Sequence, residues 1–231
     1  SALPDVRLKK LDEVTEPKPA AEIAVPDIAP SRAPAGADKI RFVLRGLDIE
    51  GATAYPHAEL ERLYSEFLEQ EVTLAQVYDI AAEIQRLYRR DGFFLTRVIL
   101  PPQTATEGRL RILVVEGYIS DIHLQGDIGP VKKKAEQYLS HVLGEKHLKL
   151  KTLERALLLV RDLPGVDVDG ILKPAANTPG AAQLVATLER KKYEGFALVD
   201  NICTSFTGKW EIAAGASANA FSELGEQVSV T

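Results

Sequence analysis

The chain has 231 residues, no methionine and one cysteine, and aromatic residues make up only 6% of it. The single cysteine, Cys203, excludes an intrachain disulfide bond, so cysteine usage leaves the redox compartment open. Because methionine is absent even at position 1, we expect a processed or excised piece, for which a removed signal peptide is one explanation. No apolar run approaches the about 18 residues that a membrane-spanning helix needs.

Basic residues are also fewer than acidic ones: the chain has 28 Lys and Arg and 33 Asp and Glu, which gives a net charge of -5. The basic runs at residues 132–134 and 190–192 are short and lie beside acidic residues, which is typical of solvated surface. Phosphate binding needs clustered Lys and Arg, so we expect no nucleic-acid partner. An RNA-binding module of the KH type would also need a Gly-x-x-Gly clamp between helices, and the sequence has none there.

Residues 1–38 are poor in aromatic side chains and rich in proline. Such a segment buries too little apolar surface to offset the entropy lost on ordering. We therefore expect a Pro-rich linker that is largely disordered. Its prolines are Pro4, Pro17, Pro19, Pro26, Pro30 and Pro34.

Residues 39–117 predict a unit with the order strand, helix, helix, strand, strand. One strand with a kink near Gly46 precedes two helical stripes, the second of which Thr73 can cap. That helix stops at Gly92, and a β-branched and aromatic run continues to Leu100. Gly108 opens the last strand.

Residues 118–192 repeat this pattern. Gly126 follows an extended stretch as Gly51 does, and a second helix again ends at a turn, here at Gly165. Segments 166–172 and 183–188 then form the closing strand pair. Since almost no linker separates the two copies, we expect them to abut with modest hinge motion.

Residues 193–231 differ from both copies, because from Lys209 small apolar and polar residues alternate. Phe196 begins a preceding strand that reaches Asp200, and Cys203 lies in the connection. Two interpretations stay open: the first strands of a transmembrane barrel, which show this dyad pattern, or a soluble amphipathic hairpin.

The sequence resembles a known family at several segments. Residues 87–96, Leu-Tyr-Arg-Arg-Asp-Gly-Phe-Phe-Leu-Thr, are similar to the helix-to-strand corner of POTRA (polypeptide-transport-associated) domains, and residues 108–117 to their third strand. Residues 118–122 resemble the junction in the haemolysin-activator (TpsB) transporters of two-partner secretion. Val199, Asp200 and Asn201, with Gly208, look like the first barrel strand and turn, although Cys203 and Thr204 replace the expected Gly-Ser.

The resemblance implies an α+β chain of two tandem POTRA domains, each with a three-stranded sheet and two helices on one face. Residues 1–38 would be a linker, 39–117 and 118–192 the two domains, and 193–231 the start of an outer-membrane β-barrel. The implied function is a periplasmic module that binds an unfolded secreted partner by β-augmentation and hands it to the barrel pore. An alternative is the POTRA region of an outer-membrane protein assembly machine. We expect no enzyme, cofactor or small-molecule substrate.

The resemblance also implies that strand two of each unit is an edge with unpaired backbone groups, to which a client can add itself as a further strand. The competing interpretation is that the aromatic residues near Gly92 are simply core. The expected client-binding residues are Phe94, Leu95, Thr96, Arg97, Val98, Ile99, Leu100, Val166, Val168 and Ile171.

Catalytic and metal-binding patterns are weak. His141, Glu145 and His147 have the form H-x3-E-x-H, but Gly144 weakens the helix that would bring them together, so we expect no metal site. Residues 167–170 look like part of a calcium loop without its final acidic ligand. Cys203 has no histidine near it in sequence, and we expect no catalytic residue.

Overall fold

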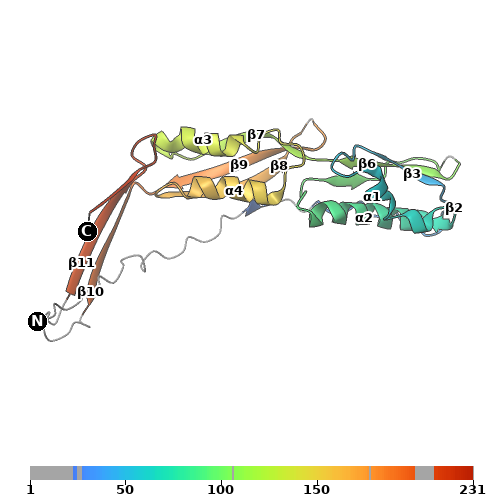
Figure 1. The fold of residues 1–231 in the computed structure, drawn as a ribbon, viewed down its shortest axis with the longest axis horizontal. Coiled ribbons are helices and arrows are strands. Elements are labelled where there is room, and N and C mark those ends of the chain that lie inside the picture. Colours follow the sequence, from blue (N-terminus) through green and yellow to red (C-terminus); the bar gives the residue numbers. More distant parts are fainter. Residues whose placement is uncertain (1–22, 25–27, 106, 177, 201–210, 231) are drawn as a thin grey trace, which may run out of the picture.

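A computed structural model describes residues 23–24, 28–105, 107–176, 178–200 and 211–230. In these residues two α+β units follow one another along the chain, and a separate antiparallel sheet follows the second unit (Figure 1). The predicted fold class, with a duplicated strand–helix–helix–strand–strand unit, is confirmed. Among the described helices, none combines the length and the hydrophobicity that crossing a membrane requires.

The first unit has a three-stranded sheet of order β3-β6-β5, in which β3 is parallel and β5 antiparallel to β6. A separate pair, β2-β4, lies beside it. The elements are β2 (Arg41–Val43), β3 (Gly46–Glu50), α1 (His57–Glu61), the 3-10 turn η2 (Ser65–Phe67), β4 (Glu71–Thr73), α2 (Leu74–Arg90), β5 (Arg97–Ile99) and β6 (Arg109–Val115).

The second unit repeats this topology, with β7 parallel and β8 antiparallel to the central strand β9. Helices α3 and α4 cover one face of the sheet (Figure 1). The elements are β7 (Tyr118–Gln125), the 3-10 turn η3 (Gly129–Val131), α3 (Lys132–Ser140), α4 (Leu150–Arg161), β8 (Val166–Pro174) and β9 (Ala181–Arg190).

The duplication extends to single glycines. Gly51 follows β3 and Gly126 follows β7, and their φ angles are +81° and +98°. A Cβ atom would lie 2.3 Å from the Val114 carbonyl oxygen in the first case and 2.0 Å from the Leu188 carbonyl oxygen in the second. Both positions therefore need glycine for its positive φ and for the close approach of the last strand.

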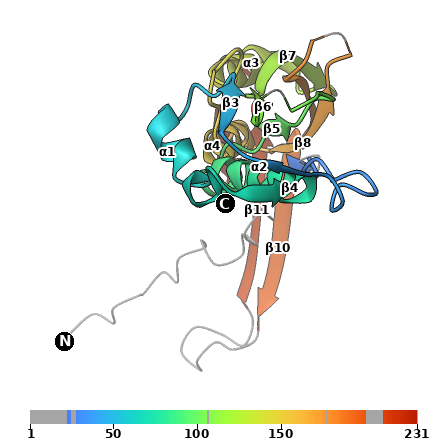
Figure 2. The same ribbon diagram turned by 90° about the vertical axis from the view of Figure 1, so that its right-hand side faces the viewer.

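The third sheet is antiparallel and joins β10 (Tyr193–Asp200), β11 (Glu211–Asn219) and β12 (Gln227–Val230). The β10–β11 ribbon projects away from the second unit in both ribbon views (Figure 2). Its base is anchored there, because the Asn219 amide donates to the Lys191 carbonyl and Ala220 is fully buried in that unit's core. The predicted connection through Cys203 lies outside the described residues.

Four local predictions need correction. The expected single strand with a kink near Gly46 is two strands in different pairings, because the chain leaves β2 at Leu44 and enters β3 at Gly46. The first helix has only five residues before it breaks into turns. The strand expected to reach Leu100 spans Arg97–Ile99. Within the expected linker, β1 (Ile23–Ala24) pairs in parallel with β8, which composition did not indicate.

Candidate client-binding surface

Strand β5 is an edge strand of the first sheet, and the backbone groups that it directs away from β6 are those of Val98. The Val98 N–H donates to the Gln85 side-chain oxygen at 3.1 Å. The Val98 carbonyl accepts from the Ser31 hydroxyl at 3.0 Å. Because both groups face away from β6, and both have partners, this edge offers an incoming strand little free backbone.

The predicted residues of the first edge divide between core and surface. Phe94 and Leu95, 8% and 7% exposed, are buried, and both pack in the core of the second unit. Thr96, Val98 and Leu100 are also buried. Arg97 is exposed and Ile99 half-buried. The side chains of Phe94 and Val98 lie in the cores of the second and the first unit, respectively.

Strand β8 is three times as long as β5, with nine residues against three. The Ala175 N–H bonds the Ala181 carbonyl and the Lys191 N–H bonds the Gly165 carbonyl, so odd-numbered residues of this ladder face β9. Hydrogen-bonding direction alternates along an antiparallel strand, and the even-numbered residues of β8 therefore direct their backbone groups outward. Val168, Gly170 and Leu172 supply outward N–H groups.

The side chains of β8 also alternate, between the core face of the sheet and its opposite face. Val166 and Val168 are buried in the core, whereas Ile171 is 44% exposed on the opposite face. Of the three residues predicted for this edge, only Ile171 presents its side chain to solvent. The backbone is what β8 offers to a partner.

A pocket of about 470 Å³ joins the two edges at the domain junction. Arg97 and Ile99 of β5 line one side, and Lys173 and the turn after β8 line the other. Ile28, from the N-terminal segment, also lines it. The structure therefore brings the predicted edges of both units to one partly apolar hollow with two cationic side chains on its walls.

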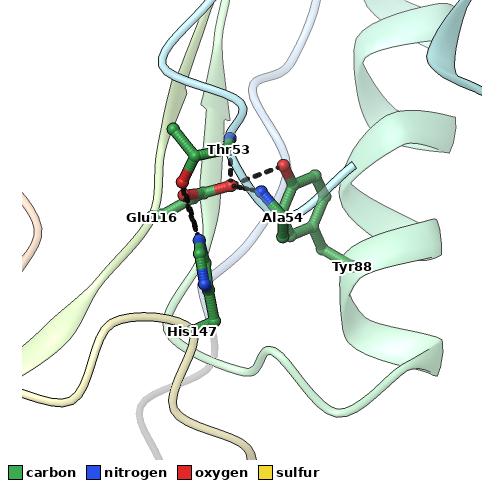
Figure 3. Close-up of polar contacts among 5 residues, drawn as sticks. All are labelled: Thr53, Ala54, Tyr88, Glu116 and His147. Carbon is green, nitrogen blue, oxygen red and sulfur yellow. Dashed lines mark hydrogen bonds and ion pairs between the residues drawn. The ribbon is translucent and has the colours of Figure 1, made fainter. Parts of the chain in front are cut away.

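A polar cluster around Glu116 lies at the junction between the two units (Figure 3). Glu116 accepts hydrogen bonds from the backbone N–H groups of Thr53 and Ala54, at 2.7 and 2.8 Å, and from the Tyr88 hydroxyl at 2.8 Å. The Thr53 hydroxyl donates to the other carboxylate oxygen. His147 of the second unit lies 2.9 Å away through Nε2. The carboxylate thus joins three segments of the first unit to a loop of the second.

The surroundings of Glu116 decide its charge. Burial alone would raise the pKa of this carboxyl, but the hydrogen bonds donated by Thr53, Ala54 and Tyr88 outweigh it and lower the pKa to about 2. Burial and the bond to the carboxylate raise the pKa of Tyr88 above its usual range. At neutral pH the Glu116 carboxylate is therefore ionised, and it accepts a hydrogen bond from the neutral hydroxyl of Tyr88.

The Gly92 corner also contacts the second unit. The Leu150 N–H donates to the Gly92 carbonyl at 3.0 Å. The Phe93 ring lies 6.1 Å from the His147 ring, and the Lys149 ammonium lies 4.9 Å from the Phe93 ring centre. The corner at Gly92 is thus also one of the places where the first unit meets the second.

Sequence reasoning missed Glu116, Gln85 and the role of His147. Glu116 was visible only as the end of an apolar run, and Gln85 only as a polar residue in the α2 stripe. His147 was considered with His141 as a weak metal pattern, whereas its ring contacts Glu116. Within the described part of the chain, no three His, Cys, Asp or Glu side chains are grouped to hold a metal ion.

Comparisons with known proteins agree with this architecture. A family model described as POTRA domain, ShlB-type, matches residues 42–117. The chain is 28% identical over 172 residues to the heme/hemopexin transporter protein HuxB of Haemophilus influenzae (strain 86-028NP), covering 74% of this chain and 30% of HuxB. It is 24% identical over 221 residues to the outer membrane transporter CdiB of Escherichia coli, covering 95% of this chain and 37% of CdiB.

Solved structures give the same fold. The structure of CdiB from Escherichia coli aligns with a TM-score of 0.68 at 23% identity, over 87% of this chain and 37% of that one. The N-terminal domain of Omp85 from Thermosynechococcus elongatus aligns with a TM-score of 0.54 at 19% identity, over 64% and 66% of the two chains. The chain thus spans about a third of the length of the curated relatives it matches.

Proposed function

We propose that this chain recognises an unfolded secreted protein. The premise is that residues 42–117 are a ShlB-type POTRA domain in a chain homologous to the two-partner secretion transporters HuxB and CdiB. The homology supports a role in protein transport. In this proposal both POTRA units lie in the periplasm, and residues 193–231 begin the barrel through which the client leaves. The client joins a sheet edge as an added strand.

The observation that carries the proposal is the outward backbone of β8. Val168, Gly170 and Leu172 direct N–H and C=O groups to the rim of the second sheet, and a two-residue strand, Ile23–Ala24, is already paired there. This edge therefore accepts an added strand in the folded chain. Main-chain pairing is largely independent of sequence, which suits a client that arrives unfolded.

The junction pocket supplies a second, weaker preference. Its walls combine apolar side chains such as Ile99 with the cations of Arg97 and Lys173. An extended client that runs from β8 toward β5 would place one apolar side chain in this pocket. A carboxylate nearby in the client would strengthen its binding through attraction to Arg97 and Lys173. The proposed client is therefore an extended segment with apolar and acidic residues close together.

The test is a pull-down with the N-terminal secretion domain of the secreted partner, using Val168→Pro and Val168→Ala variants. Proline at position 168 removes the outward N–H of that residue, whereas alanine shortens the apolar side chain and keeps that N–H. We expect Val168→Pro to lose at least 90% of the captured domain and Val168→Ala to retain most of it, with circular dichroism showing both folded. Equal capture by the two variants would contradict strand addition at β8.

The fold likeness to the Omp85 domain supports one alternative, a module of an outer-membrane protein assembly machine. Its clients would be barrel proteins rather than one secreted partner. Depletion of the chain in its host separates the two: loss of a single secreted protein supports the transporter, and a general loss of outer-membrane barrels supports assembly.

A further inference from the structure

One histidine of the second unit contacts the Glu116 carboxylate of the first. His147 lies in the loop between α3 and α4, and its backbone is left-handed, with φ +61°. Its Nε2 atom lies 2.9 Å from a carboxylate oxygen of Glu116 and 2.7 Å from the Thr53 hydroxyl (Figure 3). The His147 side chain is 34% exposed and that of Glu116 only 12%. Protons from solvent can therefore reach the ring, while the carboxylate lies deeper in the junction.

The hydrogen bonds of this cluster determine which ring nitrogen of His147 donates. The ionised Glu116 carboxylate can only accept, and the Thr53 hydroxyl donates to the same carboxylate oxygen that His147 contacts. The Nε2 atom must therefore carry a hydrogen in the neutral ring as well as in the protonated one. Protonation at Nδ1 changes the charge of the ring and keeps this donor. It adds the attraction of opposite charges to a hydrogen bond that already joins the two units.

The other charged groups near this histidine largely compensate one another. The Arg90 guanidinium lies 3.3 Å from the Asp91 carboxylate, and the Lys149 ammonium lies on the Phe93 ring, 4.9 Å from its centre. Lys149 opposes a positive charge on the histidine and Glu116 favours it, so the direct contact with Glu116 decides the sign. The titratable or charged groups on the elements around the ring are Tyr55, Tyr88, Arg90, Asp91, Glu116, Glu145, Lys146 and Lys149.

We propose that His147 and Glu116 form a pH-dependent latch between the two units. A histidine ring gains its proton between about pH 8 and pH 5, and here that proton adds an ion pair between the α3–α4 loop of the second unit and the carboxylate of the first. The latch restrains the units at the acidic end of this range and permits their rotation at the alkaline end. Phe94 and Leu95 stay in the core of the second unit in both states and form the pivot.

The junction pocket connects the latch to binding, because its walls belong to different units. Arg97 and Ile99 are residues of β5, whereas Lys173 is a residue of β8. Rotation of one unit relative to the other therefore changes the width of the pocket. The latch follows from the geometry of the junction and does not rest on the proposed function; only its effect on a client does.

The latch is tested in the whole chain with two spin labels, on a Cys203→Ser background. Arg62→Cys in the first unit and Arg155→Cys on α4 place the labels at exposed positions. Double electron–electron resonance should give a distance distribution that is at least 1.5 times as wide at pH 8 as at pH 5.5. The midpoint of the change should lie between about pH 5 and pH 8. Equal widths at both pH values would overturn the proposal, and so would a midpoint below about pH 5, where carboxylates titrate.

Two variants identify the groups that form the latch. His147→Asn removes the titrating ring with a residue type that accepts a left-handed backbone, and it should give the wide distribution at both pH values. Glu116→Gln removes the carboxylate charge and should do the same. His123→Asn is the matched control and should behave as wild type, since His123 pairs with Asp121 inside the second unit. A pH dependence that persists in His147→Asn, or disappears in His123→Asn, would contradict the assignment.

A second label pair separates the latch from a loss of folding. Arg155→Cys and Glu189→Cys both place labels in the second unit, so their distance should change neither with pH nor with the variants. If it changes in Glu116→Gln, that variant has lost structure and the His147→Asn result decides. The outcome is independent of strand addition: failure of the Val168 pull-down would leave the latch standing, and equal label widths would leave strand addition at β8 standing.

Discussion

At the residue scale, the Glu116 carboxylate lies in a dense set of hydrogen-bond donors. Its side chain is 12% exposed and accepts four hydrogen bonds from Thr53, Ala54 and Tyr88. A carboxylate with several donors is stabilised in its charged form, which is why its pKa lies below the ordinary value. Residue 116 is thus an electrostatic anchor of the junction.

We expect Glu116→Gln to lower the free energy of unfolding at pH 7 by about 1–3 kcal/mol, because charged hydrogen bonds are lost. The folded carboxyl has a pKa of about 2 against an ordinary 4.5, so its contribution is complete above pH 4.5 and disappears as pH falls toward 2. Urea denaturation at pH 7 and pH 3 measures this. A difference between wild type and variant that does not shrink with acidification would contradict the assignment.

Gly126 and Gly144 make a matched pair of left-handed residues. Both have positive φ, but a Cβ at Gly126 would lie 2.0 Å from the Leu188 carbonyl oxygen while one at Gly144 would have no atom within 4 Å. We expect Gly144→Ala to cost about 1 kcal/mol, the price of the backbone conformation alone, and Gly126→Ala clearly more. Thermal unfolding of both variants decides this, and equal melting temperatures would refute it.

At the scale of elements, α2 determines what the first edge can do. Thr73 and Gln76 form a capping box that fixes its start, and Gly92, with φ +92°, ends it. The helix then presents Gln85 to β5, which occupies the outward N–H of Val98. Strands β5 and β8 hold equivalent positions in the two units, but they differ in their capacity to pair with an added strand. The reason is that the Gln85 side chain of α2 occupies the outward N–H of β5.

Gln85→Leu should destabilise the chain by about 1–3 kcal/mol, since it leaves the buried Val98 N–H without its acceptor. Arg86→Ala on the exposed face of the same helix is the control and should change stability by less than about 0.5 kcal/mol. Chemical denaturation gives the two energies. Faster amide hydrogen exchange at Val98 in the Gln85 variant alone would locate the effect, and unchanged exchange there would count against it.

At the scale of the whole molecule, the two units share core residues. Phe94 and Leu95 follow the first unit's helix but belong to the second unit's hydrophobic core. A Cβ on Gly117, at the chain junction, would lie 3.0 Å from the Gly180 carbonyl oxygen of the second unit, so the units approach closely there. Their relative position is therefore set by packing as well as by the short connection.

Phe94→Ala should cost about 3–5 kcal/mol, as large-to-small core changes do, and should loosen the second unit although Phe94 follows the first unit's helix. Val98→Ala, in the first unit's core, is the control. Hydrogen exchange with mass spectrometry should show faster exchange in β8 and β9 for the first variant and in β5 and β6 for the second. Exchange that rises only in the first unit in both variants would exclude the shared core.

Much of the architecture could be predicted from the sequence. Hydrophobic periodicity, the Thr73 cap and the glycines at the helix ends predicted the α2 and α4 boundaries and the duplicated order, because these signals are local. The break between β2 and β3 could not be predicted, since pairing partners distant in the chain determine it. The position of Ile23 and Ala24 on β8 was hidden for the same reason: two residues of a Pro-rich segment carry no pattern.

The sequence by itself determined the repeated unit, its α+β class and its family resemblance, because helix caps, turn glycines and alternating strands act over a few residues. Only the tertiary structure decided which edge is open, that Phe94 is core to the neighbouring unit, and that Glu116 binds His147 across the junction. These depend on contacts between residues 31 to more than 100 positions apart, such as Glu116 with His147 and Ile23 with Gly170. No short pattern encodes such contacts, because the packing of complete units creates them.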